Sequence, residues 1–389
     1  MQNNKRREII NWIALSILMI FYAGTWTFPA FYHVTEIYNT SIVFVALGIL
    51  FINNVNLIKK IKEKDIMLLV LAAALVIALV NLFVIGSNKG CILILTDFLL
   101  VMYLAQNIVL SDIQKKTLEI FFLVMFASWF VYDRAFFYNA NTGATVTVFT
   151  LLGGYILLEK LCLKKEIYGF FIVIALLRTV SLVLWHLARG AFLALFVFLI
   201  FYYIVPKKLW DKKMFRRAVT AFSVFGSLLF VAAYVGMSKL GSNPKMPFFY
   251  KNVFSGREQI WQEVWELFVT MPFTGIGSGR ALKSFFEYNI HNSMYDILAV
   301  HGIIVFVLSI CLILVTMFKA GDAAVKKRES FCAFVAVTAI FFESFIDMDL
   351  MWADYSPLLL FLLYEAFDGA AKADPGNAGS VRRIANERK

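Results

Sequence analysis

Charged side chains are scarce in this sequence. Lys, Arg, Asp and Glu make up only 16% of the 389 residues, whereas hydrophobic residues make up 61%. No water-soluble domain needs that much apolar surface, so the composition excludes a soluble globular protein and predicts an all-α polytopic membrane protein. The basic start and first apolar run resemble a signal peptide. Because apolar runs recur along the whole chain, we interpret the first as a retained membrane helix.

Histidine and cysteine are also scarce, with four of each. The cysteines lie in or beside apolar runs, with neither the spacing of metal ligands nor that of a secreted disulfide framework. No two histidines have the spacing of a metal site. The sequence therefore predicts no metal and no cofactor.

The apolar runs predict about 12 transmembrane helices, since a spanning helix needs roughly 20 apolar residues. The predicted spans are 9–28, 40–58, 65–86, 91–110, 117–138, 145–163, 166–186, 190–206, 218–236, 293–318, 329–346 and 356–370.

Basic residues predict the orientation of these spans. Most of the 37 lysines and arginines fall in segments on the side of the N-terminus, such as 59–64 and 206–217. Positive charge accumulates on the cytoplasmic side, so both termini are expected there. The expected organisation is nine spans in 1–236, an outer-face loop in 237–292, three spans in 293–370 and a disordered tail in 371–389. The net charge of +11 thus indicates membrane orientation rather than nucleic-acid binding.

The long loop contains a predicted amphipathic helix. Ser255 followed by Glu258 is the signature of a capping box, which starts a helix expected to run to about Thr270. Apolar residues recur at helical spacing, and two of them are Trp261 and Trp265. Such a helix suits the membrane interface.

Arg257 occupies the first turn of that helix, where the helix dipole disfavours a cation by up to about 1 kcal/mol. A bound anion would reverse this effect, because the free amides and the guanidinium would both hold it. The glycine-rich turn "GIGSG" at 275–279 could bring further backbone amides to a ligand. The alternative is an ordinary solvated arginine beside a common turn.

Other polar residues also have two interpretations. Arg189, next to Gly190 between two spans, is either an interfacial arginine or a second cation at the outer mouth. His291 lies where the loop meets the next span, which Asn292 can cap; it is either an interface residue or a functional one.

Ionisable residues inside the predicted spans are expected to mark a polar cavity or buried pairs. These residues are Asp97, Arg178 and Arg134 with Asp133. The aspartates 347, 349 and 354 are expected to form a solvated acidic loop on the outer side.

Three motifs in order resemble the O-antigen ligase and O-antigen polymerase superfamily of bacterial membrane glycosyltransferases. They are "LARGA" at 187–191, "SGREQIW" followed by "MPFTGIGSG" at 255–279, and "HNSMYDILAVHG" at 291–302. The sequence departs from the family at Ala188, where serine is common.

The resemblance implies an enzyme that moves a glycan from undecaprenyl diphosphate to a sugar or lipid-glycan acceptor, with inversion and without metal. The site would lie on the outer face of the cytoplasmic membrane, in contact with membrane lipid. Arg189 and Arg257 would bind the diphosphate of the donor, as would Arg280 after the glycine turn. His291 would act at the reaction centre.

Two alternatives remain at this point. A polymerase that joins repeat units of an O-antigen or a capsule uses the same donor linkage and differs in its acceptor. A lipid-linked oligosaccharide flippase or a transporter would concentrate charge at the bilayer midplane, with broken helices in matched halves. The notable cations here are instead expected at the outer edge.

Overall fold

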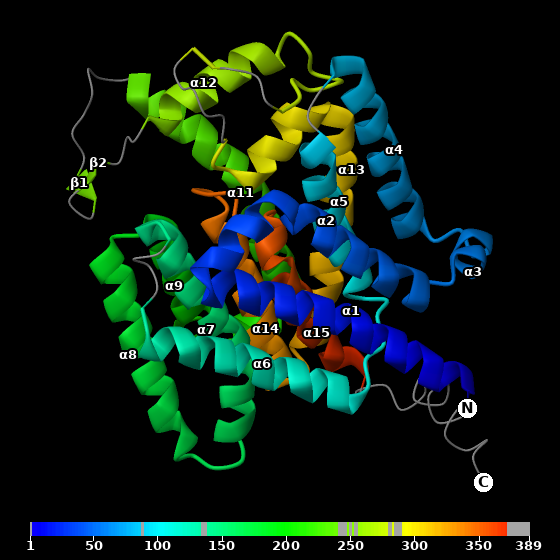
Figure 1. Ribbon diagram of the computed structural model, residues 1–389. Helices are drawn as coiled ribbons and strands as arrows, with labels where there is room; N and C mark the ends of the chain where they lie inside the picture. The colour runs from blue at the N-terminus through cyan, green and yellow to red at the C-terminus, as the bar shows by residue number, and fades with distance from the viewer. Residues whose placement is uncertain are drawn as a thin grey trace.

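The protein is built almost entirely from helices (Figure 1). The computed structural model describes residues 2–86, 89–133, 138–239, 247–248, 251–252, 256–278, 282–283 and 290–371. Arg134, Ser255 and Arg280, which were discussed above, lie outside the described residues, as does most of the predicted tail.

The elements follow one another in this order: α1 Gln2–Thr27, α2 Pro29–Asn54, α3 Leu57–Lys62, α4 Ile66–Ile85, α5 Lys89–Leu104, α6 Asp112–Val131, α7 Ala140–Cys162, α8 Tyr168–His186, α9 Arg189–Leu199, the π-helix η1 Ile200–Ile204, α10 Lys207–Trp210, α11 Lys213–Lys239, β1 Pro247–Phe248, β2 Lys251–Asn252, α12 Arg257–Phe268, α13 Ser293–Ala324, α14 Arg328–Glu343, the 3-10 helix η2 Ala353–Tyr355 and α15 Ser356–Ala371. The two short strands pair antiparallel.

The all-α prediction is confirmed, and every predicted span overlaps a helix. By length and composition, seven of the described helices can cross a membrane: those within α1, α2, α4, α7, α8, α11 and α13. The other predicted spans coincide with shorter or less apolar helices. The second span was predicted too short, because α2 begins at Pro29, directly after the turn that ends α1. The chain is a multi-pass membrane protein.

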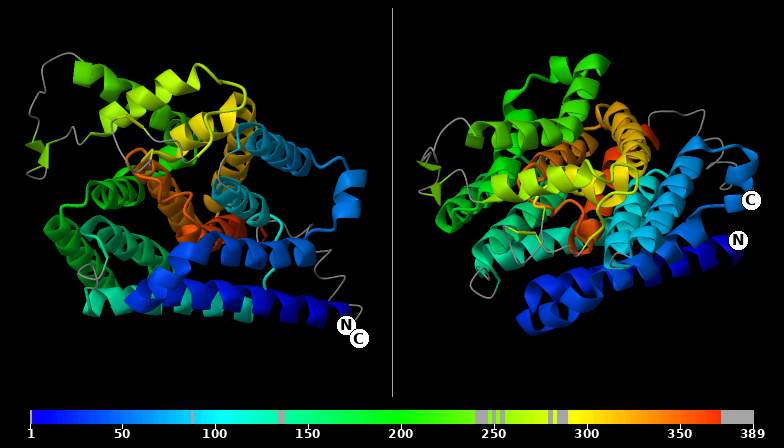
Figure 2. Two further views of the ribbon diagram at one scale, coloured as in Figure 1. Left: turned by 45° about the horizontal axis from the view of Figure 1, so that its top comes forward. Right: turned by 90° about the horizontal axis from the view of Figure 1, so that it is seen from above.

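The helices α14 and α15 form the centre, surrounded by α7, α9, α11 and α13 (Figures 1 and 2). Nearly all of α14 is buried. Peripheral helices instead expose large apolar side chains, such as Phe83 on α4, which is 74% exposed. Contiguous apolar surface of this kind is what lipid tails contact in a membrane protein.

Small residues bring two of the inner helices close together. A Cβ at Gly154 of α7 would lie 3.0 Å from the Cα of Leu123 on α6, and one at Gly153 would lie 2.7 Å from a methyl carbon of Leu358 on α15. Gly154 therefore lets α7 approach the backbone of α6, and Gly153 leaves room for a side chain of α15, as small residues commonly do between membrane helices.

One end of the helix bundle is held by ion pairs. Lys115 at the start of α6 lies 3.4 Å from Glu365 and 2.6 Å from Asp368 near the end of α15. Lys160 at the end of α7 lies 3.1 Å from the same Glu365. Lys327, just before α14, contacts Asp368 at 2.8 Å. We call these five residues the ionic cluster; they hold together elements that are far apart in the sequence.

The opposite end of the bundle carries α12, which lies across the top of α11 and α13 (Figure 1). The junctions between α8 and α9 and between α14 and α15 belong to the same end, because Arg189 and Asp347 line one pocket with Arg257 of α12. The residues singled out by the sequence therefore meet here.

Candidate functional site

Arg189 is the first residue of α9, after a sharp reversal of the chain. Leu187 has a positive φ of 54°, which ends α8 and lets Ala188 lead into the next helix. At the following position, a Cβ on Gly190 would lie 2.8 Å from Oε1 of Glu343 on α14 and would displace that side chain. The start of α9 is thus pressed against a buried carboxyl group.

Arg257 is likewise the first residue of its helix, α12. The residue directly before the helix is Gly256, with a φ of 91° and no side-chain cap, rather than Ser255, which lies outside the described residues. The Glu258 carboxylate does accept a hydrogen bond from the Gly256 amide at 3.1 Å. Among the described residues, the motif therefore contributes only the hydrogen bond to the Glu258 carboxylate. The helix begins at Arg257 and ends at Phe268 rather than at Thr270.

The two tryptophans of α12 have different environments. Trp261 is buried against Phe230 and Tyr234 of α11, and its indole nitrogen donates to the Ile290 carbonyl at 2.6 Å. Trp265 is 51% exposed. The prediction that both face the membrane interface was therefore wrong for Trp261, which binds α12 to the start of α13 instead.

His291 lies immediately before α13 and is held by its neighbour in the chain. The Asn292 side chain caps α13 by accepting from the Tyr295 amide at 2.9 Å, which confirms the predicted cap. The same side chain accepts from Ser227 of α11 at 2.8 Å and donates to the Phe345 carbonyl at 3.0 Å. Because Asn292 is fully buried, three elements fix the position of His291.

The imidazole of His291 faces a carboxylate. Its Nδ1 lies 3.1 Å from Oδ1 of Asp347, and Nη2 of Arg257 lies 3.6 Å from Oδ2 of the same aspartate. Burial would raise the pKa of Asp347, but the hydrogen bond from His291 and the charges of His291 and Arg257 together hold it below its usual value. Asp347 therefore carries a negative charge that orients both partners.

The two arginines line one small pocket of about 40 Å³, together with Glu343 and Asp347. Burial lowers the pKa of Arg189, and the positive charge of Arg257 lowers it further. Two like charges held this close repel each other, and an anion between them would turn that repulsion into attraction. The pocket has the composition of a site for an anionic group.

The glycine-rich turn has a different role from the one predicted. The amides of Ile276 and Gly277 donate to the carbonyls of Ala299 and Val300 at 2.8 and 3.1 Å, and the Ile303 amide donates to Pro272 at 2.8 Å. These bonds fill the gap where Gly302 breaks α13, with a φ of 85° and a ψ of 167°. At Ile276 and Gly277 the turn supports a broken helix, so these amides do not face a ligand.

Three carboxyl groups gather beside the arginines, a group that the sequence analysis missed. One oxygen from each of Glu343, Asp347 and Asp349 lies within 4.8 Å of the others, close enough to share a divalent cation. The acidic segment is not the solvated loop that was expected: burial and the charge of Asp347 raise the pKa of Asp349 well above its usual value. The raised pKa of Asp349 favours its neutral form, and Arg257 lies beside Asp347, so part of the negative charge of the three carboxyl groups is already offset.

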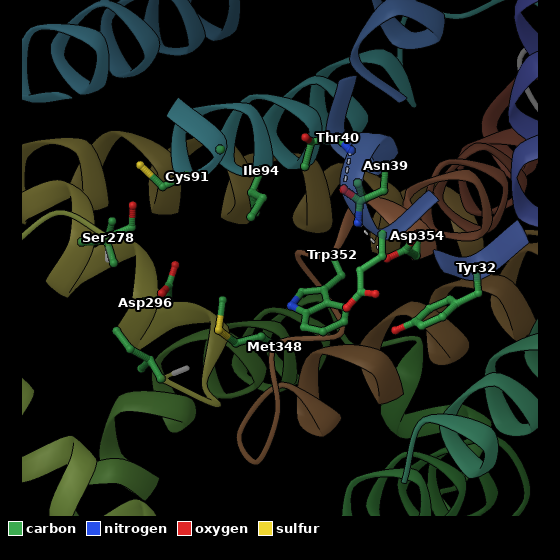
Figure 3. A pocket seen from close by; sticks show the side chains of 15 residues that line it. Tyr32, Asn39, Thr40, Cys91, Ile94, Ser278, Asp296, Met348, Trp352 and Asp354 are labelled. Carbon is green, nitrogen blue, oxygen red and sulfur yellow. Dashed lines mark hydrogen bonds between the residues drawn. The ribbon is translucent and has the colours of Figure 1, made fainter. Parts of the chain in front are cut away.

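A larger cavity of about 360 Å³ lies beside this pocket, between α2, α5, the start of α13 and the segment 348–354 (Figure 3). Asp354 lines it and is only 2% exposed. Burial raises the pKa of Asp354 to about 6, although a hydrogen bond from Asn39 at 3.1 Å opposes the shift. We call this space the acidic cavity; its residues are named below where they are used.

The ionisable residues inside predicted spans serve separate purposes. Asp133 contacts His186 at 2.8 Å, and Arg178 donates to the Phe130 carbonyl at 3.4 Å. The carboxylate of Asp97 is buried and has no hydrogen-bond partner among the described residues. Asp133 therefore pairs with a partly exposed histidine and Arg178 with a backbone carbonyl, whereas Arg134, the expected partner of Asp133, lies outside the described residues.

Residues 170–310 match the model of the family described as O-Antigen ligase. A search of the curated proteins found no match. The matched region includes Arg189, Arg257 and His291, which the structure brings together, and also Arg280. Both the match and the helical membrane fold agree with the resemblance carried by the three motifs. The chain thus carries an O-antigen ligase domain at residues 170–310, and this domain supports a place in the O-antigen ligase superfamily and a glycan-processing function at the membrane.

Proposed function

We propose that the protein transfers a glycan from undecaprenyl diphosphate to a sugar acceptor at the outer face of the cytoplasmic membrane. The observation that carries the proposal is the convergence of Arg189 and Arg257 on one pocket beside the His291–Asp347 pair. Each arginine begins a helix, so each lies where the helix dipole also attracts an anion.

The leaving group explains the need for arginines. A glycosyl diphosphate already has a good leaving group, so the site must stabilise the negative charge that develops on the diphosphate as its bond to the anomeric carbon breaks. Arginine forks can bridge phosphate oxygens and supply this stabilisation. Arg189 and Arg257 are assigned this role, and Arg280 is proposed as a third contact.

The acceptor requires a base. Its hydroxyl oxygen forms the new bond to the anomeric carbon from the opposite face, which inverts the configuration, and its proton must be removed. His291 accepts this proton through Nε2 while Nδ1 donates to Asp347, an arrangement that fixes the orientation of the imidazole. Asp347 is a positioning residue in this scheme.

The exposed side of α12 is proposed to meet the membrane interface. Trp265, Val269 and Phe273 are 51%, 52% and 65% exposed, and they follow one another along the end of the helix and the turn after it. Large apolar and aromatic side chains at this end of the bundle suit the outer leaflet, where the polyprenyl chain of the donor would lie.

The test is an arginine-to-lysine exchange in purified protein in nanodiscs. A lysine keeps the charge but loses the fork, so Arg189→Lys and Arg257→Lys should each lower transfer from an undecaprenyl-diphosphate disaccharide by about 10- to 100-fold. The control is Arg217→Lys on α11; this arginine lies over the ring of Phe318 on α13, away from this pocket. Near-normal transfer by either pocket variant would refute the diphosphate site.

The same assay addresses the group of three carboxylates. We expect transfer to persist in excess EDTA, because the arginines supply the positive charge that a divalent cation would otherwise supply. Loss of transfer on chelation, restored by magnesium, would instead assign a cation to Glu343, Asp347 and Asp349.

A further inference from the structure

The acidic cavity is built like a binding site for a small polar molecule. Its volume of about 360 Å³ falls within the range of small-molecule pockets. In the view of Figure 3, Trp352 lies in the middle of the lining, with Ser278 and Asp296 toward one end and Asn39 and Asp354 toward the other. An aromatic face flanked by hydrogen-bonding groups at both ends matches a sugar ring, which has apolar faces and a polar rim.

The cavity borders the proposed reaction centre. Two chain segments run between the cavity and the arginine pocket. On each segment, one residue faces the cavity and its neighbour in the sequence faces the arginine pocket or the His291–Asp347 pair. Asp347 lines the arginine pocket and Met348 lines the acidic cavity. Ile290 lines the acidic cavity, and His291 contacts Asp347. A molecule in the cavity would therefore be next to the base and the donor pocket.

One polar atom in the lining lacks a partner. Oδ2 of Asp354 accepts from Asn39 at 3.1 Å, but Oδ1 is buried and has no hydrogen-bond partner in another described residue. A buried carboxylate oxygen without a partner is unfavourable, and a ligand hydroxyl or amino group would satisfy it. The cavity thus needs a hydrogen-bond donor at this end.

The charge of the lining selects among sugars. Glu36, Asp296 and Asp354 line the cavity, whereas none of the described residues that line it is basic. A carboxylate-bearing sugar would bring a further negative charge into a half-enclosed site, which is disfavoured by repulsion and by loss of solvation. Neutral hydroxyls and amino groups have no such penalty.

We propose that the acidic cavity binds a neutral or amino-bearing pyranose of the acceptor glycan and excludes uronic acids. This inference rests on the proposed transferase function, for which it supplies the acceptor side. Trp352 would stack on the ring, and Asp354 would accept from a ring hydroxyl.

The test uses two probes that differ in one group, methyl glucoside and methyl glucuronide. Binding to the protein in nanodiscs is measured by saturation-transfer NMR, with empty nanodiscs as background and no donor present. We expect the glucoside to bind and the glucuronide to show at least tenfold weaker binding. Trp352→Ala should weaken glucoside binding by about tenfold, while Trp265→Ala, at an exposed tryptophan of α12, should leave it unchanged.

A gain of binding gives the strongest support. The double variant Glu36→Gln, Asp354→Asn removes two carboxylates from the lining and should admit the glucuronide. The inference is overturned if the glucoside does not bind, if Trp352→Ala binds it normally, or if wild-type protein binds both sugars equally. Arg257→Lys should not alter glucoside binding. A separate measurement tests the proposed diphosphate site. That proposal fails if the arginine variants bind undecaprenyl diphosphate as well as wild-type protein does.

Discussion

Replacing Gly302 by alanine tests how the broken helix α13 is held. Its φ of 85° is strained for any residue with a Cβ, at about 1–2 kcal/mol. The added Cβ would also lie 2.2 Å from the Phe273 carbonyl oxygen, a backbone atom that can move only if the turn leaves α13. That movement would break the hydrogen bonds from Ile276, Gly277 and Ile303, each contributing about 1 kcal/mol. The expected destabilisation is therefore about 4–5 kcal/mol.

The assay is thermal unfolding of detergent-solubilised protein, followed by intrinsic fluorescence. A loss of this size should lower the midpoint by about 5 °C, given that one kcal/mol shifts a domain of 150–250 residues by about 2–4 °C and a longer chain by less. The control is Gly48→Ala in the middle of α2, where a Cβ would meet nothing within 4 Å and should stabilise the helix by about 0.5–1 kcal/mol. If Gly302→Ala melts with wild-type protein, the turn does not hold the helix as described.

Three further predictions concern the base, the buried aspartate and the topology. His291→Gln should lower turnover by roughly 10²–10⁴-fold without weakening undecaprenyl diphosphate binding; an active variant would remove His291 from the mechanism. The pKa of Asp354 is raised to about 6, so the fold favours the protonated form of this carboxyl group. The resulting stabilisation is complete below the unfolded pKa of about 3.9 and is lost as pH rises through 6. Asp354→Asn should therefore raise the melting point relative to wild-type protein at pH 7 but not at pH 4; an equal effect at both would contradict the assignment. In a cysteine-free background, Phe273→Cys (exposed by 65%) should react with an impermeant thiol reagent in intact spheroplasts and Met214→Cys (exposed by 85%) should not, and the opposite pattern would invert the proposed topology.

The helices could be predicted from the sequence because a membrane imposes a simple rule of length and polarity. Runs of apolar residues identified every long helix, and Asn292 marked the start of α13. This rule does not predict which face of a helix packs against its neighbours. Trp261 and Trp265 have the same apolar character, yet only tertiary packing decides that one lies against α11 while the other is exposed.

The arrangement of the candidate site was predicted only in part. The positions of Arg189, Arg257 and His291 followed from the family resemblance, and the structure adds that they converge. The contribution of Glu343 was missed because it lies at the end of a predicted span, where its carboxyl group had no visible partner in the sequence. The glycines at 275 and 277 were misinterpreted because an amide in a turn can serve a ligand or a backbone carbonyl, and sequence does not distinguish the two.

The ionic cluster has a consequence for how the chain is assembled. Lys115 contacts Asp368, which follows it by 253 residues in the chain. During synthesis this lysine emerges long before its carboxylate partner exists, so it is unpaired while the early helices take up their orientation. In the proposed topology it acts first as a cytoplasmic retention signal, and only after the last helix has inserted as one half of a structural ion pair. A truncation that removes α15 would therefore leave the orientation of α6 intact. It would also remove the two carboxylates that pair with Lys115 at the start of α6.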